Sequence, residues 1–267
     1  GGAQRYTAQN QVQYTGNING SGYGGIGVHA TDYADDLDFD AGVTVNNSTL
    51  HTTGSGGITA QATTGGTISS KNSLKSAGVI PVALAFSKHS IDYDNAVKVE
   101  GNSTLTTDKA DSDITLAAAD DTDVKLETIA DTQGGAVGAA SAEAENTMNR
   151  SNKITLGSGS TLHSTNDINL YAGENAGGAK SGLNLQVLAD AYNNTAIPVY
   201  TDPKVKNTMT QANQVELAGT AESVRHINAS AAKGTTTVTE SAQEYKIWTG
   251  TGGQFCQCDR FGHGRDP

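Results

Sequence analysis

Short apolar pairs recur along the chain in a fixed arrangement. In each copy, an apolar-x-apolar pair is followed by a short polar link, one apolar residue, a polar turn and a second apolar-x-apolar pair. The copies begin at Val43, Val97, Ile154 and Val215. The resulting period of roughly 54–61 residues indicates a repeat protein, in which one repeat cannot bury its apolar face alone and stacks on its neighbours.

The local pattern within each copy predicts strand, corner and strand. In Val97-Lys98-Val99 the alternation places valine inward and lysine outward, as in a half-buried β-strand. The links that follow contain Asn or Gly, which tolerate positive φ and so predict tight corners. After the corner a leucine is expected to return to the core in three of the copies, at Leu50, Leu105 and Leu162.

A second recurring block consists of small residues and precedes each first apolar pair. Gly25, Gly78 and Gly135 each stand roughly 18–19 residues before the next pair, whereas Gly178 stands about twice as far from it. This spacing predicts a solenoid turn of roughly 18–20 residues, with the segment 178–214 adding one extra turn. The fold predicted is all-β, a parallel β-helix (β-solenoid) with about three turns per 54–61-residue repeat.

Two other fold classes fit the sequence less well. A β-sandwich would show more Asn-Gly or Asp-Gly hairpins and more aromatic residues than the 5% present. The Ala-rich segment 136–148 is compatible with a helix, but its place in the repeat favours a strand with small inward side chains.

Composition narrows the classes of function. The net charge of −11 and the lack of Lys/Arg stripes argue against nucleic acid and against anionic lipid as partners. No apolar run approaches the roughly 18 residues of a membrane span, so no transmembrane segment is expected. The 32 glycines and few aromatic residues suit the thin core of a solenoid.

The repeat frame resembles that of large secreted repetitive bacterial exoproteins, the filamentous-haemagglutinin-like and leukotoxin-like filamentous adhesins. The stretches that carry the resemblance are Asn102-Ser103-Thr104-Leu105, Asp113-Ile114-Thr115-Leu116, Asp167-Ile168-Asn169-Leu170, Asn146-Thr147-Met148 and Asn207-Thr208-Met209. The resemblance covers roughly residues 24–240. It implies a right-handed parallel β-helix, secreted and retained at the bacterial cell surface, whose partners are host-cell surfaces or neighbouring bacterial cells.

On this basis the sequence is interpreted as a non-enzymatic, structural and adhesive segment of a longer surface protein. Residues 1–248 would form the parallel β-helix and residues 249–267 an irregular or disordered tail. The body of a leukotoxin-like toxin and a polysaccharide-degrading β-helix enzyme are the alternatives. Enzymatic cleavage of sugars would need paired carboxylates, and sugar clefts usually also carry aromatic platforms and Arg, whereas the lone Trp248 is near the C-terminus and Arg is scarce in the repeats.

Clustered aspartates are the candidate metal ligands. Asp36, Asp38 and Asp40 alternate with Leu37 and Phe39, so on a strand the three carboxylates share one face. Calcium prefers such oxygen ligands, and the alternative is a solvated acidic face. No other cofactor is expected. A second, looser cluster comprises Asp111, Asp113, Asp120, Asp121 and Asp123.

Three further features are open at the sequence level. Cys256, Cys258 and His263 have the ligand types of a zinc site, although their segment departs from the repeat frame. The densest apolar and aromatic patch is expected to contact a partner, and it comprises Tyr192, Ile197, Val199 and Tyr200. Uncapped solenoid ends expose unpaired strand edges, which predicts end-to-end self-association.

Overall fold

The computed structural model describes residues 2–250 and 253–261, and all the regular secondary structure in these ranges is β-strand. The strands are β1 (Gln4–Asn46), β2 (Thr49–Thr52), β3 (Ile58–Glu100), β4 (Thr104–Thr107), β5 (Ile114–Gln133), β6 (Val137–Leu156), β7 (Thr161–Ser164), β8 (Ile168–Ala172), β9 (Gly182–Asn194), β10 (Ile197–Leu217), β11 (Thr220–Ser223), β12 (Ile227–Ala231), β13 (Thr235–Gly250) and β14 (Gly253–Phe261). The prediction of an all-β chain is confirmed.

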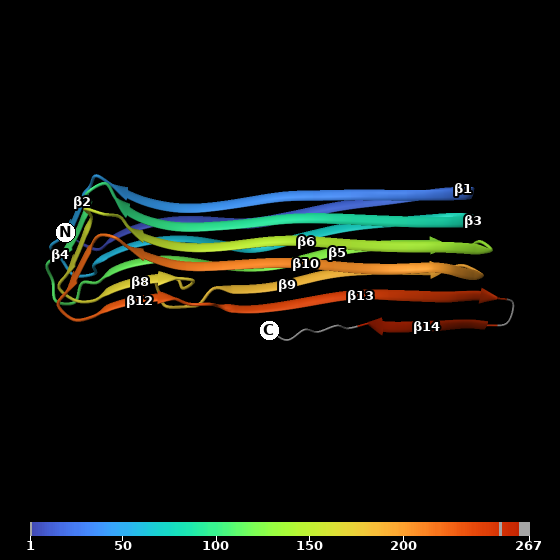
Figure 1. Ribbon diagram of the computed structural model, residues 1–267. Coiled ribbons are helices and arrows are strands. Elements are labelled where there is room, and N and C mark those ends of the chain that lie inside the picture. The colour runs from blue at the N-terminus through green and yellow to red at the C-terminus, as the bar shows by residue number, and fades with distance from the viewer. Residues whose placement is uncertain (1, 251–252, 262–267) are drawn as a thin grey trace.

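Each repeat forms one long, flattened layer with two arms. An outbound arm runs to a bend, and a return arm runs back beside it. In β1 and β3 the strand continues through the bend, near residues 24–25 and 78–79, and β3 pairs with β5 before its bend and with β6 after it. In later layers the arms are separate strands, β5 with β6 and β9 with β10. Figure 1 shows the bends gathered at one end and the short strands β2 and β4 at the other.

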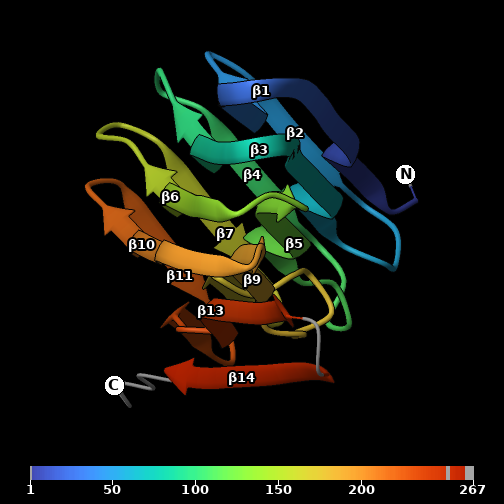
Figure 2. The ribbon, with the colours of Figure 1, turned by 90° about the vertical axis from the view of Figure 1, so that its right-hand side faces the viewer.

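Successive layers stack by parallel pairing of equivalent arms. β1 pairs with β3 from Gln4↔Ile58, β3 with β5 from Ile58↔Ile114, and β6 with β10 up to Leu156↔Leu217. The short strands form their own parallel sheet in the order β11-β7-β4-β2. Figure 2 shows the layers following one another along the stack, with β14 beside β13.

The pairing corrects the predicted number of turns. Partners lie a whole repeat apart in sequence, so one repeat makes one layer, and the expectation of about three turns per repeat is wrong. The constant spacing from the small-residue block to the next apolar pair is real, but it measures the length of one arm between its bend and its corner. Sequence spacing locates the bends and does not say which strand an arm pairs with.

The extra turn predicted for residues 178–214 is likewise absent from the described fold. Gly178 lies in an excursion at residues 173–181, between β8 and β9, and the bend of this layer falls at residues 195–196, between β9 and β10. The long interval after Gly178 therefore contains the rest of an outbound arm and most of a return arm. At the bend of the preceding layer, Gly134 and Gly135 have φ of 72° and 86°, a conformation that favours glycine.

The corners and core positions follow the sequence pattern. Asn47 and Asn102 have positive φ at 47° and 60°, and Gly159 takes the same place with φ of 79°. Leu105 and Leu162 are fully buried beyond these corners, and Leu50 in the first layer is half-buried. The Ala-rich segment belongs to strand β6, where alternate small residues point inward, and all three of Ala140, Ala142 and Ala144 are fully buried.

The interior between the two arms contains two apolar clusters. One lies toward the bends and includes Leu126, Met148 and Leu185, and the other lies toward the corners and includes Leu116, Ile154 and Leu170. Buried polar side chains separate the clusters along each arm. The core is thin, as the composition predicts, because the two arms face each other directly.

The C-terminal segment is partly outside the described residues. Within it, β14 runs antiparallel to β13, pairing Ala242↔Phe261 through Gly250↔Gly253. The side chains of Cys256 and Cys258, and the whole of His263, lie outside the described part of the structure. The predicted boundary at residue 248 and the zinc hypothesis therefore stay predictions.

Candidate functional site

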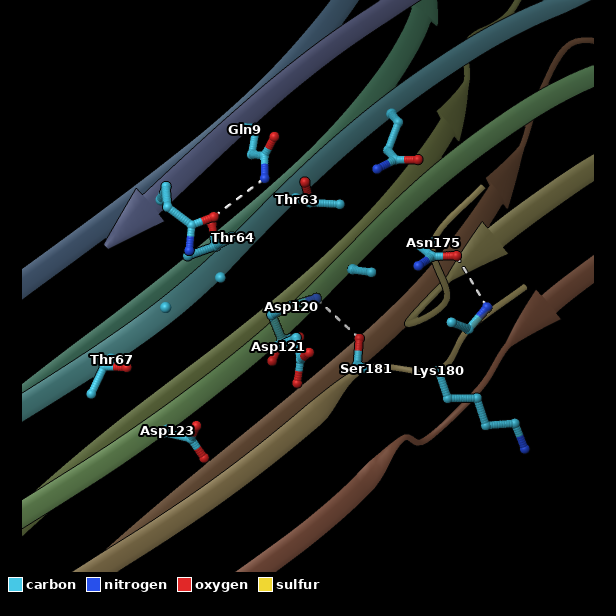
Figure 3. Close-up of a pocket in the computed structure, with 16 residues that line it drawn as sticks. Gln9, Thr63, Thr64, Thr67, Asp120, Asp121, Asp123, Asn175, Lys180 and Ser181 are labelled. Atoms are coloured by element: carbon cyan, nitrogen blue, oxygen red, sulfur yellow. Dashed lines mark hydrogen bonds between the residues drawn. The ribbon is translucent and has the colours of Figure 1, made fainter. Parts of the chain in front are cut away.

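A polar groove crosses the outbound arms of the first three layers. It has a volume of about 480 Å³. Most of its floor is made by outward-facing residues of β1, β3 and β5, and one wall is the excursion 173–181 (Figure 3). The lining residues are Gln9, Gln11, Gln61, Thr63, Thr64, Gly65, Gly66, Thr67, Ala119, Asp120, Asp121, Asp123, Asn175, Ala179, Lys180 and Ser181.

Hydrogen bonds hold the wall of the groove in place. The Asn175 side chain accepts bonds from the backbone amides of Gly177 and Ala179, at 2.9 and 3.0 Å, which closes the excursion on itself. The Ala176 amide donates to Gln61 Oε1 at 3.1 Å, which joins the excursion to the second layer. The backbone amide of Asp120 donates to Ser181 Oγ at 3.1 Å. Hydrogen bonds therefore attach the excursion to strands β3 and β5 of the sheet.

Two adjacent glycines, Gly65 and Gly66, line the groove. Gly66 has φ of 133°, and a Cβ at this position would lie 1.9 Å from the carbonyl oxygen of Val12 in the neighbouring layer. The backbones of the two layers therefore approach too closely to leave room for a side chain at Gly66.

The chemistry of the groove is that of hydrogen bonding. Amide groups come from Gln9, Gln11 and Gln61, hydroxyls from Thr63 and Thr67, and charges from Asp121, Asp123 and Lys180. None of the described lining residues is aromatic, His or Cys. The arrangement presents donors and acceptors to a polar ligand and holds no nucleophile beside an imidazole base. Of these residues, only the aspartates are candidates predicted from the sequence, because outward Gln and Thr are common on any solvated strand.

Beneath the groove lies a buried ion pair. Asp120 Oδ2 accepts a hydrogen bond from Arg150 Nε at 2.7 Å and a second from Arg150 Nη2, and both side chains are fully shielded from solvent. Asn152 Nδ2 donates to Asp120 Oδ1 at 2.7 Å. Every oxygen of the carboxylate therefore has a donor, as a buried charge requires.

Asn152 is also the centre of a ladder that crosses the layers. Thr64 Oγ1 donates to Asn95 Oδ1 at 2.8 Å, Asn95 Nδ2 donates to Asn152 Oδ1 at 3.1 Å, and Asn152 Nδ2 donates to Asn213 Oδ1 at 3.0 Å. This ladder was not predicted from the sequence. The signal was present, because each asparagine stands two residues before the first apolar pair of its repeat.

A second buried polar group brings Asp, His and Ser together nearer the bends. His89 Nδ1 lies 3.2 Å from Asp35 Oδ2, and Ser70 Oγ donates to the same oxygen at 3.1 Å. Burial lowers the pKa of His89, and the Asp35 carboxylate opposes this shift only in part. Because the serine contacts the carboxylate and not the imidazole, this group lacks the serine–histidine contact of a nucleophilic triad.

The predicted calcium ligands lie on the outer face of the return arm of β1. Asp36, Asp38 and Asp40 are exposed on one face, and Leu37 and Phe39 pack inward, as the alternation predicted. The next layer adds Asp92 opposite Asp38 and Asp94 opposite Asp40. Asp40 chiefly, with desolvation and the other three carboxylates, raises the pKa of Asp38.

These carboxylates are not arranged as a metal site. Within the described ranges, no three His, Cys, Asp or Glu side chains converge as a bound metal ion would require. Calcium binding at Asp36, Asp38 and Asp40 stays a prediction. The second acidic cluster is dispersed, since Asp120 is in the core, Asp121 and Asp123 line the groove, and Asp113 accepts bonds from Asn166 and Asp167 at a corner.

The predicted partner patch lies at the bend of the fourth layer. Ile197, Val199 and Tyr200 are 52%, 64% and 51% exposed. Tyr192 stands apart from them, stacked on Tyr245 with ring centroids 4.4 Å apart. Other bends are also apolar and exposed, at Tyr23, Ile26, Val28 and Val79. Partner contact at this edge stays a prediction.

Comparison of the chain with known protein families, curated proteins and solved structures finds no significant match. No helix capable of crossing a bilayer occurs in the residues that the structure describes.

Proposed function

We propose that the chain is a right-handed parallel β-helix segment of a large secreted bacterial surface protein, with a structural and adhesive role and no enzymatic activity. The observation that carries this proposal is the stacking of equivalent arms, layer on layer, into long faces of outward polar side chains. The sequence resemblance to filamentous adhesins supports the same class. A solenoid of this kind provides an extended surface for many weak contacts.

The groove is the part of this surface best suited to hold a ligand. Its amides, hydroxyls and charged groups fit a hydroxylated polymer such as a glycan chain on a host or neighbouring bacterial cell. The groove crosses three layers, so it offers contacts to several units of a chain.

The test is binding of the fluorescently labelled chain to host cells, neighbouring bacterial cells and a glycan array. In the variant Q11A/D123A both changes remove exposed polar groups of the groove. Its affinity is expected to fall about thirtyfold, since the two lost hydrogen bonds to a ligand are worth about 1 kcal/mol each. The matched control Q13A/D111A removes the same side-chain types at exposed positions outside the groove and should bind like the wild type.

Other outcomes would redirect the proposal. Equal loss in both variants, or no saturable binding to any surface, would refute the groove as the adhesive site. Loss of binding on chelation would implicate the acidic strip at Asp36, Asp38 and Asp40. Release of sugar fragments from the array would indicate the polysaccharide-degrading alternative, and killing of the host cells would indicate the toxin body.

A further inference from the structure

The groove continues into a second, smaller hollow on the outer face of the outbound arms. The hollow has a volume of about 80 Å³ and shares Thr67 and Asp123 with the groove. Its other outward side chains are those of Lys125, Asn184 and Gln186. Because Asp123 pairs with Asn184 and Lys125 pairs with Gln186, the hollow extends the groove onto strand β9 of the fourth layer.

The groove and the hollow together form an oblique path across the sheet. Gln9 lies at one end of this path in the first layer, and Gln186 lies at the other end in the fourth. Gln186 is in register with Thr15 of the first layer, through Lys125 and Ser69, so the path also advances about six residues along the strands. With about 4.8 Å between strands and a rise of about 3.3 Å per residue, the path is about 25 Å long. A linear polymer can contact this whole length, whereas a compact ligand covers only part of it.

The side chains at the hollow suit a ligand with hydroxyl groups. Among the described residues, the side chains of Thr67, Asn184 and Gln186 have no hydrogen-bond partner. Thr67 and Asn184 are exposed and Gln186 is half-buried, so a ligand can reach all three from outside. Their hydroxyl and amide groups both donate and accept hydrogen bonds, as the hydroxyl groups of a sugar do. The hollow therefore continues the hydrogen-bonding chemistry of the groove.

The middle of the path is negatively charged. Among the described residues, Asp121 and Asp123 have no ion-pair partner. Lys125 contacts Glu127 instead, with 3.7 Å between Nζ and Oε2, and Figure 3 shows the Lys180 side chain extending away from both aspartates. Such carboxylates accept hydrogen bonds from the hydroxyl groups of a ligand, but they repel its acidic groups.

Glycines on both sides leave the Asp121 carboxylate uncovered. The residues paired with Asp121 are Gly65 in the second layer and Gly182 in the fourth. A Cβ at Gly182 would clash with Asp121 Oδ1, so the carboxylate occupies the space that a side chain at this position would need. The two small neighbours therefore give the carboxylate its place in the path.

We propose that the groove and the hollow form one binding track for a linear glycan without acidic groups, which runs obliquely from the first layer to the fourth. Asn184 and Gln186 bind the units of the glycan beyond the groove, and Asp121 and Asp123 select against uronic or sialic acid units. The proposal rests on the groove as the ligand site and adds the length and the charge class of the ligand.

The experiment is binding of the fluorescently labelled chain to linear oligosaccharides from disaccharides to octasaccharides, in neutral hexose, N-acetylhexosamine and uronic acid series. Affinity for the uncharged series should rise with length. The variant N184A/Q186A should bind the longest uncharged members about thirtyfold more weakly and the disaccharides like the wild type. The matched control N149A/Q214A removes the same side-chain types at exposed positions on the return arms and should bind every member like the wild type.

A second variant tests the charge class. D121N/D123N should bind the uronic acid series on the order of tenfold more tightly than the wild type does, because the like charges are removed. Its affinity for the uncharged series should change little, since asparagine keeps hydrogen-bonding groups at both positions. Circular dichroism of every variant confirms the β-fold.

The outcomes separate this proposal from the one on which it rests. Absence of binding to every series would refute the groove as a glycan site and the track with it. Three results would overturn the track alone: equal affinity for short and long members, wild-type binding by N184A/Q186A, or tighter binding of the wild type to uronic acids than to uncharged sugars.

Discussion

Removing one partner of the buried pair Arg150–Asp120 should destabilise the chain strongly. Both side chains have no exposed surface, so Asp120→Leu leaves a guanidinium without its counter-charge, and Arg150→Met leaves a carboxylate with Asn152 as its remaining side-chain donor. Each single substitution is expected to lower the free energy of unfolding by about 3–5 kcal/mol. The double variant D120L/R150M buries two apolar side chains in the same place and should recover most of that loss, to within about 1–2 kcal/mol of the wild type.

Urea unfolding followed by circular dichroism at pH 7 measures these differences as a double-mutant cycle. The control is Lys153→Met on the same strand, whose ion pair with Glu216 is about one-third exposed and should be worth no more than about 1 kcal/mol. Single variants that cost no more than this control would refute the reasoning. So would a double variant whose loss equals the sum of the two singles, because the charges would then be independent.

Three further predictions address the glycine floor, the buried histidine and the layered core. Gly66→Ala should cost about 1–3 kcal/mol in urea unfolding from backbone strain alone, and a change below about 0.5 kcal/mol would contradict the close approach of the layers. Burial lowers the pKa of His89 beneath its value of roughly 6.5 in the unfolded chain, so unfolded chains bind a proton that folded ones exclude. The free energy of unfolding should therefore fall as the pH drops from 7 to 5. The variant His89→Gln has no titrating ring, although its contact with Asp35 is altered, so its free energy of unfolding should fall less over the same range. Leu105→Ala should cost about 2–5 kcal/mol, and Leu50→Ala distinctly less because Leu50 is only half-buried; equal losses would contradict this difference in burial.

The sequence predicted the local structure well because local structure depends on alternation and on corner residues. Val97 and Val99 point inward, and Asn47 and Asn102 take the left-handed conformation at corners. The same alternation placed Asp36, Asp38 and Asp40 on the outer face. These outcomes follow from the two-residue period of a strand and from the steric freedom of asparagine.

The size of a layer and the position of the groove could not be predicted, because both depend on which strands pair with each other. The alternation of apolar and polar residues does not determine strand pairing. The spacing between a bend and the next corner fits equally a short turn and half of a long one, and only the register Gln4↔Ile58 distinguishes them. The groove needs Gln11, Gly66 and Asp121, from three different layers, to lie side by side next to one excursion. The buried ladder was not predicted because the recurrence of asparagine two residues before each apolar pair, as at Asn152, was not considered.

The register of the stack also determines how the chain can fold. Contacts between layers join positions a whole repeat apart, on the order of a fifth of the chain length, so local contacts can do little to begin the process. The first pair of layers must close a long loop before any strands pair, so the formation of this nucleus is slow. Each later layer then pairs with a strand edge that is already formed, on which the asparagines and valines already mark the register. Folding should therefore proceed as growth along a template, fastest where an ordered edge already exists.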